Sequence, residues 1–173
     1  VPIYYAGQVY SLHYSSLIIY IGISLSVFMF LNLREQAIAF CGDVGSVVLA
    51  YIIAFITIQL IISSGKIQFI MFGSVYGVDS IFTIIRRLLK SENIFLPHRT
   101  HLYQLLSNEL GWNFLRISLI YSSLQLFISL IIFLSIQMVP QYSTIISLII
   151  IFVLSAIYFL SLKKLTFNLT KNN

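Results

Sequence analysis

The chain has 173 residues, of which 59% are hydrophobic and only 9% charged, and its mean hydropathy is +0.97. Soluble domains carry about 25% charged residues, so this composition excludes a soluble globular protein and predicts an integral membrane protein. The net charge of +5 is explained by basic residues in the loops, and we expect no nucleic acid partner. At ~20 residues per span, the length allows about five membrane-spanning helices.

Five apolar segments predict an all-α, polytopic transmembrane helix bundle that forms a single membrane domain in a lipid bilayer. They run over Tyr14–Leu31, Val44–Ser63, Ile67–Leu89, Phe114–Met138 and Ser143–Leu162. Each segment is continuously apolar, with no proline in its middle, whereas the strands of a β-barrel alternate over ~10 residues. The loops are expected at about 33–43 and 90–113.

Basic residues mark one side of the predicted bundle. Because five spans alternate in direction, the two loops and the tail after Lys163 share one side. Nine of the ten basic residues lie there or at helix ends that face it, and only Lys66 lies opposite. The positive-inside rule predicts that this side is cytoplasmic. The nine residues are Arg34, Arg86, Arg87, Lys90, Arg99, Arg116, Lys163, Lys164 and Lys171.

The segment from Phe40 to Ser46 places Asp43 between two glycines at the start of an apolar helix. One interpretation is a helix cap, because the carboxylate could accept backbone N–H bonds there. The other is a functional acid. Flanking glycines let another molecule approach the backbone, and a carboxylate at this position suits a hydrated Mg²⁺ that carries substrate phosphates. The only cysteine, Cys41, excludes an internal disulfide and is interpreted as a small packing residue, with a reactive thiol as the alternative.

Two histidines lie in the long polar loop. His98 and His101 share one face if Pro97 starts a helix, as proline often does in a first turn. Arg99 between them adds a planar fork that suits phosphate oxygens. A zinc site would need further ligands, which the neighbouring sequence lacks. Before any resemblance is considered, an ordinary solvated loop is the favoured interpretation.

Asp79 lies midway along an apolar span. An acid inside a membrane is a functional candidate by default, and the side chains of Arg86 and Arg87, about two turns away, could reach back toward it. An ion pair or a hydrogen bond to a neighbouring helix is the alternative, and we favour a mainly structural role. Three other titratable residues are interpreted as ordinary surface or loop groups: His13, Glu92 and Glu109.

Together these motifs resemble the polyprenyl-phosphate N-acetylhexosamine-1-phosphate transferases, a membrane family that includes phospho-N-acetylmuramoyl-pentapeptide transferase. The family's Phe-x-Gly-Asp-x-Gly-Ser motif matches Phe40–Ser46. Two further matches are Val78–Ser80 followed by Arg86–Leu88, and His98–Gln104. Order, spacing and predicted side agree across roughly Asn32–Trp112. The form of the last motif resembles the branch that starts O-antigen and related glycans.

The resemblance implies transfer of a sugar-1-phosphate from a UDP-N-acetyl-amino sugar to polyprenyl (undecaprenyl) phosphate, with release of UMP. This would initiate a cell-surface glycan at the cytoplasmic face of the bacterial inner membrane. Asp43 would bind Mg²⁺, or Mn²⁺ in its place, at the diphosphate. His98 and His101 would contact substrate phosphates, Arg99 would neutralise the diphosphate, and Phe40 would stack on uracil. The remaining expected substrate-binding residues are Gly42, Gly45, Ser46, Tyr103 and Gln104.

Part of the family pattern is absent from these residues, namely the paired-aspartate motif and the Asn-rich Asp-Gly loop. The chain also opens with Val1-Pro2-Ile3, without an initiator methionine. We therefore expect it to be the C-terminal half of a longer enzyme, inactive without the missing N-terminal half. Two other classes stay open: a catalytically incomplete membrane scaffold, and a transporter or channel whose path follows Asp79 and the nearby Ser74, Ser80 and Thr83. Transporter sites usually lie at the midplane, whereas the polar groups here gather in the loops, which favours the transferase.

Overall fold

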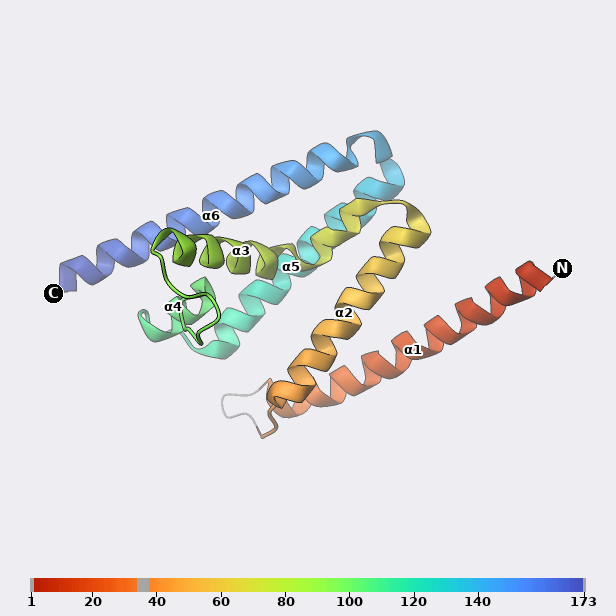
Figure 1. Ribbon diagram of the computed structural model, residues 1–173, viewed down its shortest axis with the longest axis horizontal. Coiled ribbons are helices and arrows are strands. Elements are labelled where there is room, and N and C mark those ends of the chain that lie inside the picture. The colour runs from red at the N-terminus through yellow and green to blue at the C-terminus, as the bar shows by residue number, and fades with distance from the viewer. Residues whose placement is uncertain (1, 34–37, 173) are drawn as a thin grey trace. The chain divides into compact units, whose positions relative to one another are not determined.

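The computed structural model describes residues 2–33 and 38–172, with side chains described over 16–33 and 38–165. The chain divides into two compact units, Val1–Ser46 and Val47–Asn173, and each unit is considered by itself. The described residues are helical and form no strand (Figure 1). Arg34 lies outside the described residues, and the side chains of His13 and Lys171 lie outside the described side chains.

The first unit consists of the helix α1 and the first turn of α2. Helix α1 spans Pro2–Asn32, so it begins earlier than the predicted Tyr14, and α2 spans Gly42–Ser64. The side-chain amide of Asn32 donates a 2.8 Å hydrogen bond to the carbonyl oxygen of Ala39. This bond connects the end of α1 to the short segment that precedes α2.

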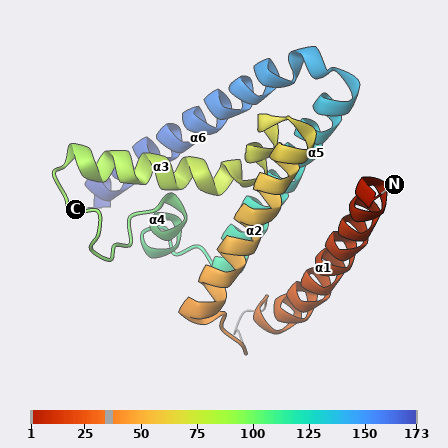
Figure 2. The same cartoon turned by 45° about the vertical axis from the view of Figure 1, so that its right-hand side comes forward.

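The second unit contains the rest of α2 and six further elements. Figures 1 and 2 show α5 and α6 as a helical hairpin closed by η2, with α3 beside α6, and the short α4 packs against α3, α5 and α6. Helix α6 continues past the predicted end at Leu162. The bounds are Ile67–Gly73 for the 3₁₀ helix η1, Ser74–Leu89 for α3, Leu102–Asn108 for α4, Phe114–Met138 for α5, Pro140–Tyr142 for η2 and Ser143–Asn172 for α6.

Four helical segments of the described chain are long and apolar enough to cross a membrane: Gly42–Ser64, Ile67–Leu89, Phe114–Met138 and Pro140–Leu165. A shorter apolar helix covers Ser16–Asn32 within the described side chains. Helices suit the bilayer because each backbone N–H and C=O is satisfied inside its own segment. The prediction of a polytopic helical bundle is confirmed, with four spans of sufficient length and one shorter apolar helix.

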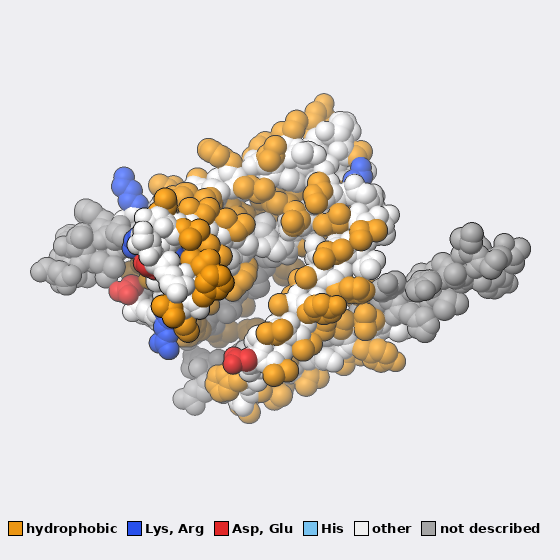
Figure 3. All heavy atoms as spheres, viewed as in Figure 1, with side chains coloured by type: hydrophobic (Ala, Val, Ile, Leu, Met, Phe, Trp, Pro, Cys, Tyr) orange, Lys and Arg blue, Asp and Glu red, His pale blue; other side chains and the backbone are white. Residues whose placement is uncertain are grey.

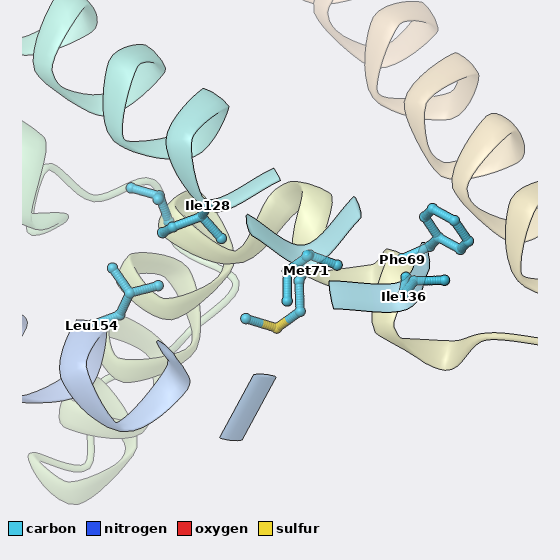
Figure 4. Packing of buried hydrophobic residues seen from close by; sticks show 7 residues of the cluster. Phe69, Met71, Ile128, Ile136 and Leu154 are labelled. Carbon is cyan, nitrogen blue, oxygen red and sulfur yellow. The ribbon is translucent and has the colours of Figure 1, made fainter. Parts of the chain in front are cut away.

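The core of the second unit lies between η1, α3, α5 and α6. Figure 4 shows Met71 between Ile128 and Leu154 on one side and Phe69 and Ile136 on the other. Met71 is only 3% exposed, and its flexible thioether suits the irregular gap left between a 3₁₀ helix and two α-helices. The contact brings η1 against both members of the α5–α6 hairpin.

Helix α3 turns a polar stripe toward its neighbours. Val75, Asp79, Thr83 and Arg87 recur every fourth residue, so they share one helical face, and all four are buried. Apolar side chains such as Ile81 lie on the exposed surface, at 58% exposure. This is the pattern expected in lipid, where polar groups face protein partners and apolar groups face the hydrocarbon.

The Ile67–Leu89 segment was predicted as one continuous span, but it changes from a 3₁₀ helix to an α-helix at Gly73. Gln125 of α5 bonds the backbone at this change. Its side-chain amide donates to the carbonyl oxygen of Met71 at 2.9 Å, and its carbonyl oxygen accepts from the N–H of Val75 at 2.9 Å. Backbone groups freed by the altered winding therefore have partners within the bundle.

Charged side chains of the second unit gather at one end. Figure 3 shows blue Lys and Arg side chains at the end where α3 finishes and α4 lies, while orange hydrophobic side chains cover the helices. Lys66 lies at the opposite end, two residues before Gln68, whose side-chain amide bonds to Ser143 at the start of α6. The predicted separation of Lys66 from the other basic residues is therefore present in this unit.

Candidate functional site

Asp79 of α3 is the centre of a buried polar cluster. It is 2% exposed, and its carboxylate accepts four hydrogen bonds from three other places in the chain. The backbone N–H groups of Leu102 and Tyr103 donate at 2.8 and 3.3 Å, the hydroxyl of Tyr121 at 3.1 Å and that of Thr83 at 3.3 Å. A carboxylate has about four acceptor positions, so these bonds compensate for its burial.

The two backbone bonds explain where α4 begins. The first N–H groups of a helix have no partner inside it, and Asp79 binds those of Leu102 and Tyr103 from a different helix. His101 is the residue before α4, with extended backbone, and its own N–H donates to the side-chain oxygen of Gln104 at 3.3 Å. The histidine-bearing segment is thus attached to α3 by a carboxylate in the membrane-spanning part of the chain.

No helix starts at Pro97, so the condition under which His98 and His101 would share a helical face is not met. Residues 97–100 are irregular, and α4 starts at Leu102. Arginine side chains of α3 donate hydrogen bonds to carbonyl oxygens of this loop, in place of the bonds that a helix would form. The Arg87 guanidinium donates to the carbonyl oxygens of Asn93, Ile94 and Leu96, and Arg86 donates to that of Thr100.

The histidine rings meet without that helix. The ring centroids of His98 and His101 lie 4.9 Å apart, and the ring of Tyr103 stacks on His101 at 5.6 Å with an angle of 20°. Tyr76 of α3 stacks on His101 at 6.3 Å with an angle of 22°. The His101 side chain is 16% exposed, and its Nδ1 lies 3.7 Å from Oδ1 of Asp79. Four rings and one carboxylate therefore form a compact group at the loop end of α3.

Protonation states in this group follow from burial and charge. Partial burial lowers the pKa of the His98 imidazole below its ordinary value of 6.5, and the nearby Arg87 and His101 lower it further. Burial raises the pKa of the Tyr103 phenol, with Tyr76 and Asp79 adding to the effect. Near neutral pH, His98 is therefore a neutral ring that can accept a proton, and Tyr103 is a hydrogen-bond donor.

The hydrogen bond between Asp79 and a neighbouring helix, one of the two alternatives drawn from the sequence, is present, because the hydroxyl of Tyr121 on α5 donates to its carboxylate. The suggestion that Arg86 and Arg87 reach back to it is wrong, since both guanidinium groups bind the loop instead. Glu92 was interpreted as an ordinary loop carboxylate, but its Oε2 lies 2.9 Å from Nε of Arg87. The Arg87 side chain is 6% exposed, and a buried cation needs such a partner.

The acidic motif belongs to the first unit. Helix α2 begins at Gly42, so Asp43 lies inside the first turn and not at the cap position. Gly42 has φ +65°, a conformation that favours glycine. Gly45 is required for another reason, because a Cβ there would lie 2.7 Å from Sγ of Cys41. That contact agrees with the interpretation of Cys41 as a packing residue.

Asp43 is exposed, and its carboxylate forms no hydrogen bond with the residues that the structure describes. Its oxygens are therefore free to bind a cation, and Mg²⁺ commonly uses one or two carboxylates together with water and substrate phosphates. Among the described residues, no group of three or more His, Cys, Asp or Glu side chains could hold a metal. A single exposed carboxylate could supply one ligand to a hydrated cation, and the described residues form no closed zinc site.

The structure brings some of the predicted site residues together. In the second unit, His98, His101 and Tyr103 form one group, Gln104 bonds to the backbone of His101, and Arg99 is exposed on the same loop. In the first unit, Phe40 is 82% exposed, and the hydroxyl of Ser46 donates to the carbonyl oxygen of Gly42 at 2.8 Å.

Sequence reasoning missed three contributors to the histidine group: Tyr76, Tyr121 and Glu92. The position of Tyr76, three residues before Asp79, gave a signal, because residues three apart share a helical face. Tyr121 and Glu92 gave none, since their partners lie on other elements.

Comparisons of the chain with protein-family models, with curated proteins and with solved structures find no match.

Proposed function

We propose that the chain takes part in transferring a sugar-1-phosphate from a UDP-N-acetyl-amino sugar to polyprenyl phosphate, on the cytoplasmic face of a bacterial inner membrane. One observation carries the proposal. Two segments that match the family pattern, Val78–Ser80 and His98–Gln104, are joined directly by the Asp79 hydrogen bonds to Leu102 and Tyr103. Independent chance matches would have no reason to be in contact, so the contact supports their belonging to one site.

In the proposed reaction, an oxygen of the acceptor phosphate forms a bond to the β-phosphorus of the UDP-sugar. The bond from that phosphorus to the oxygen bridging the two phosphates breaks, and the bridging oxygen leaves with UMP. Both substrates are anionic, and the loop end of the second unit carries Arg99, exposed, together with Lys90. Stabilising charge that develops at phosphate oxygens is the main requirement of such a transfer.

Asp43 would hold Mg²⁺ through one carboxylate oxygen, and the bound cation would offset the charge of the diphosphate. His98, neutral near pH 7, would line the diphosphate site and accept hydrogen bonds or a proton from the substrate. His101 would contact a phosphate oxygen through the ring nitrogen that faces away from Asp79. Phe40, with most of its ring exposed, would offer a surface on which uracil can stack.

The transporter alternative gains no support from Asp79 and Thr83, two of the polar residues on which it depends. Thr83 is 0% exposed, and its hydroxyl bonds to Asp79 and lies 3.2 Å from that of Tyr158. Asp79 itself is fully engaged by donors from α3, α4 and α5. These groups bind one another inside the second unit, whereas an ion path needs polar groups that face water.

Asp43→Asn tests the proposal. The chain is expressed together with the expected N-terminal half, from the native reading frame that contains both, and membranes are assayed with radiolabelled UDP-N-acetyl-amino sugar, polyprenyl phosphate and Mg²⁺. We expect UMP release and a labelled lipid from the wild type, and at least a ~100-fold lower turnover in the variant, because a charged contact in the transition state is lost. Glu109→Gln, which removes an exposed loop carboxylate, is the matched control and should retain wild-type turnover. Near-normal turnover of Asp43→Asn would rule out the metal role, and no UMP release from the wild type would reject the transferase.

A further inference from the structure

A shallow groove with a volume of about 740 Å³ runs along one face of α5, beginning at the start of the helix. The residues that line it recur at spacings of three and four, so they share one helical face. The opposite face carries Tyr121, which bonds to α3, Gln125, which bonds to η1, and the fully buried Ile132. Residues in the groove include Arg116, Leu119, Ile120, Ser123 and Phe127.

The groove lies away from the histidine group. Tyr121 donates to Asp79, and the same carboxylate accepts from the first N–H of α4 at Leu102. The face of α5 that carries Tyr121 is therefore the one next to the histidines, and the groove is on the other face. A molecule in the groove would thus not meet a substrate bound by His98 or His101.

One end of the groove is positively charged. Arg116 lies in the first turn of α5, is exposed, and forms no salt bridge with a described carboxylate. Its guanidinium lies 4.5 Å from the centre of the Trp112 ring, within the range of a cation–π contact. No Asp or Glu is among the described residues that line the groove. This end suits the phosphate of a headgroup with net negative charge, and it offers no carboxylate to the ammonium of a zwitterionic headgroup.

The rest of the groove is mostly apolar, and its length matches one leaflet of a bilayer. From Arg116 to Phe127 the helix rises about 16 Å, at ~1.5 Å per residue, and half of a ~30 Å hydrocarbon core is about 15 Å. Leu119, Ile120 and Phe127 are exposed along this stretch. A partner helix that crosses the membrane would need a contact face along the whole span, whereas an acyl chain ends near the middle of the bilayer.

We propose that this face of α5 binds one anionic phospholipid from the leaflet that contains the start of the helix. Its phosphate lies at Arg116, whose planar fork can donate two parallel hydrogen bonds, and one acyl chain lies along residues 119–127. An acyl chain gains little by leaving one apolar setting for another, so the headgroup provides the selectivity and the groove sets the course of the chain. This lipid is a bound partner of α5 and takes no part in the proposed transfer.

Native mass spectrometry tests the proposal, because the mass of each complex identifies what is bound. The chain is released from micelles that contain equal amounts of phosphatidylglycerol and phosphatidylcholine. We expect the wild type to retain one phosphatidylglycerol in at least a ~10-fold excess over phosphatidylcholine, since a hydrogen bond to a charged group contributes that much or more. Arg116→Gln should abolish the preference. Lys164→Gln, which removes an exposed basic residue from α6, is the matched control and should keep it.

Ser123→Phe tests the course of the acyl chain, because it places a ring in the groove and leaves the charge unchanged. We expect it to lose the retained lipid as Arg116→Gln does. Ser122→Phe is its matched control, being the same substitution at a neighbouring exposed residue that does not line the groove, and it should retain the lipid.

Three results would overturn the proposal. A preference that persists in Arg116→Gln, or that falls equally in Lys164→Gln, would mean that no specific headgroup contact exists. Full retention in Ser123→Phe would mean that the chain does not lie in the groove. A complex that carries a second copy of the chain, or the co-expressed N-terminal half, in place of the lipid would assign this face of α5 to a protein contact.

Discussion

Arg87 fixes the loop that carries the histidines. Its guanidinium is buried at the end of α3, pairs with Glu92 and donates to three carbonyl oxygens of the following loop. A planar group with five N–H donors suits this arrangement, because it can bond several acceptors in one plane. His98 lies within range of the charge of this arginine.

Burial, together with the charge of Arg87, gives His98 a predictable pH dependence. Because the pKa of His98 is lowered in the folded chain, the folded state binds the proton less tightly than the unfolded state, whose histidine titrates near 6.5. The stability contributed by the neutral ring is therefore present above pH 6.5 and is lost as the pH falls through this value. We expect the NMR titration of the His98 ring to have its midpoint below 6.5.

Glu92→Gln is the matched variant for this titration. Glu92 raises the pKa of His98, so its neutralisation should lower the midpoint further. The variant keeps an oxygen that can accept from Nε of Arg87, and the loop should therefore persist. A wild-type midpoint above 6.5 would mean that burial and Arg87 do not govern the ring, and a midpoint that rises in the variant would contradict the assigned role of Glu92.

At the scale of elements, the change from η1 to α3 depends on one glutamine. Gln125 bonds both a carbonyl oxygen before the change and an N–H after it, and it also donates to the hydroxyl of Ser129 at 3.1 Å. We expect Gln125→Leu to lower the free energy of unfolding by about 1–2 kcal/mol, because it leaves backbone groups without partners in a setting that excludes water.

Gln137→Leu on the same helix is the control for this change, since Gln137 is exposed and the substitution is chemically identical. Reversible unfolding in mixed micelles, followed by helical circular dichroism, compares the two variants with the wild type. Equal stability of the two variants would show that the Gln125 side chain does not stabilise the change from η1 to α3.

Periodicity and composition predicted the helices of this chain well, because a long apolar run in lipid has few alternatives to a helix. They did not predict α4, a short helix that lies within the loop expected at 90–113. They failed where a distant side chain decides the local structure. The start of α4 depends on a carboxylate 23 residues away, and the winding of η1 depends on Gln125, which is 50 residues from its partner Val75. The residues of the candidate site could thus be proposed from the sequence, but their positions relative to one another could not.

At the scale of the whole chain, the distribution of basic residues predicts which side of the membrane each end of the second unit faces. In the second unit, Arg86 and Arg87 bind the loop that leads to α4, Lys90 follows α3 and Arg99 lies in that loop, whereas Lys66 precedes η1, which bonds to the start of α6 through Gln68. The proposed function requires the histidine group on the cytoplasmic side, where the nucleotide sugar is found.

Cysteine accessibility in intact cells tests this orientation. Cys41 is the only cysteine of the chain, so Cys41→Ala provides a background without thiols. A membrane-impermeant thiol reagent should label Lys66→Cys from outside, because Lys66 lies at the end that bears few positive charges. Glu109→Cys, placed on an exposed residue after α4, should be labelled only after the cells are permeabilised. The reverse pattern would place the histidine group on the outer face, away from any nucleotide sugar, and the transferase proposal would then fail whatever the residues at the site.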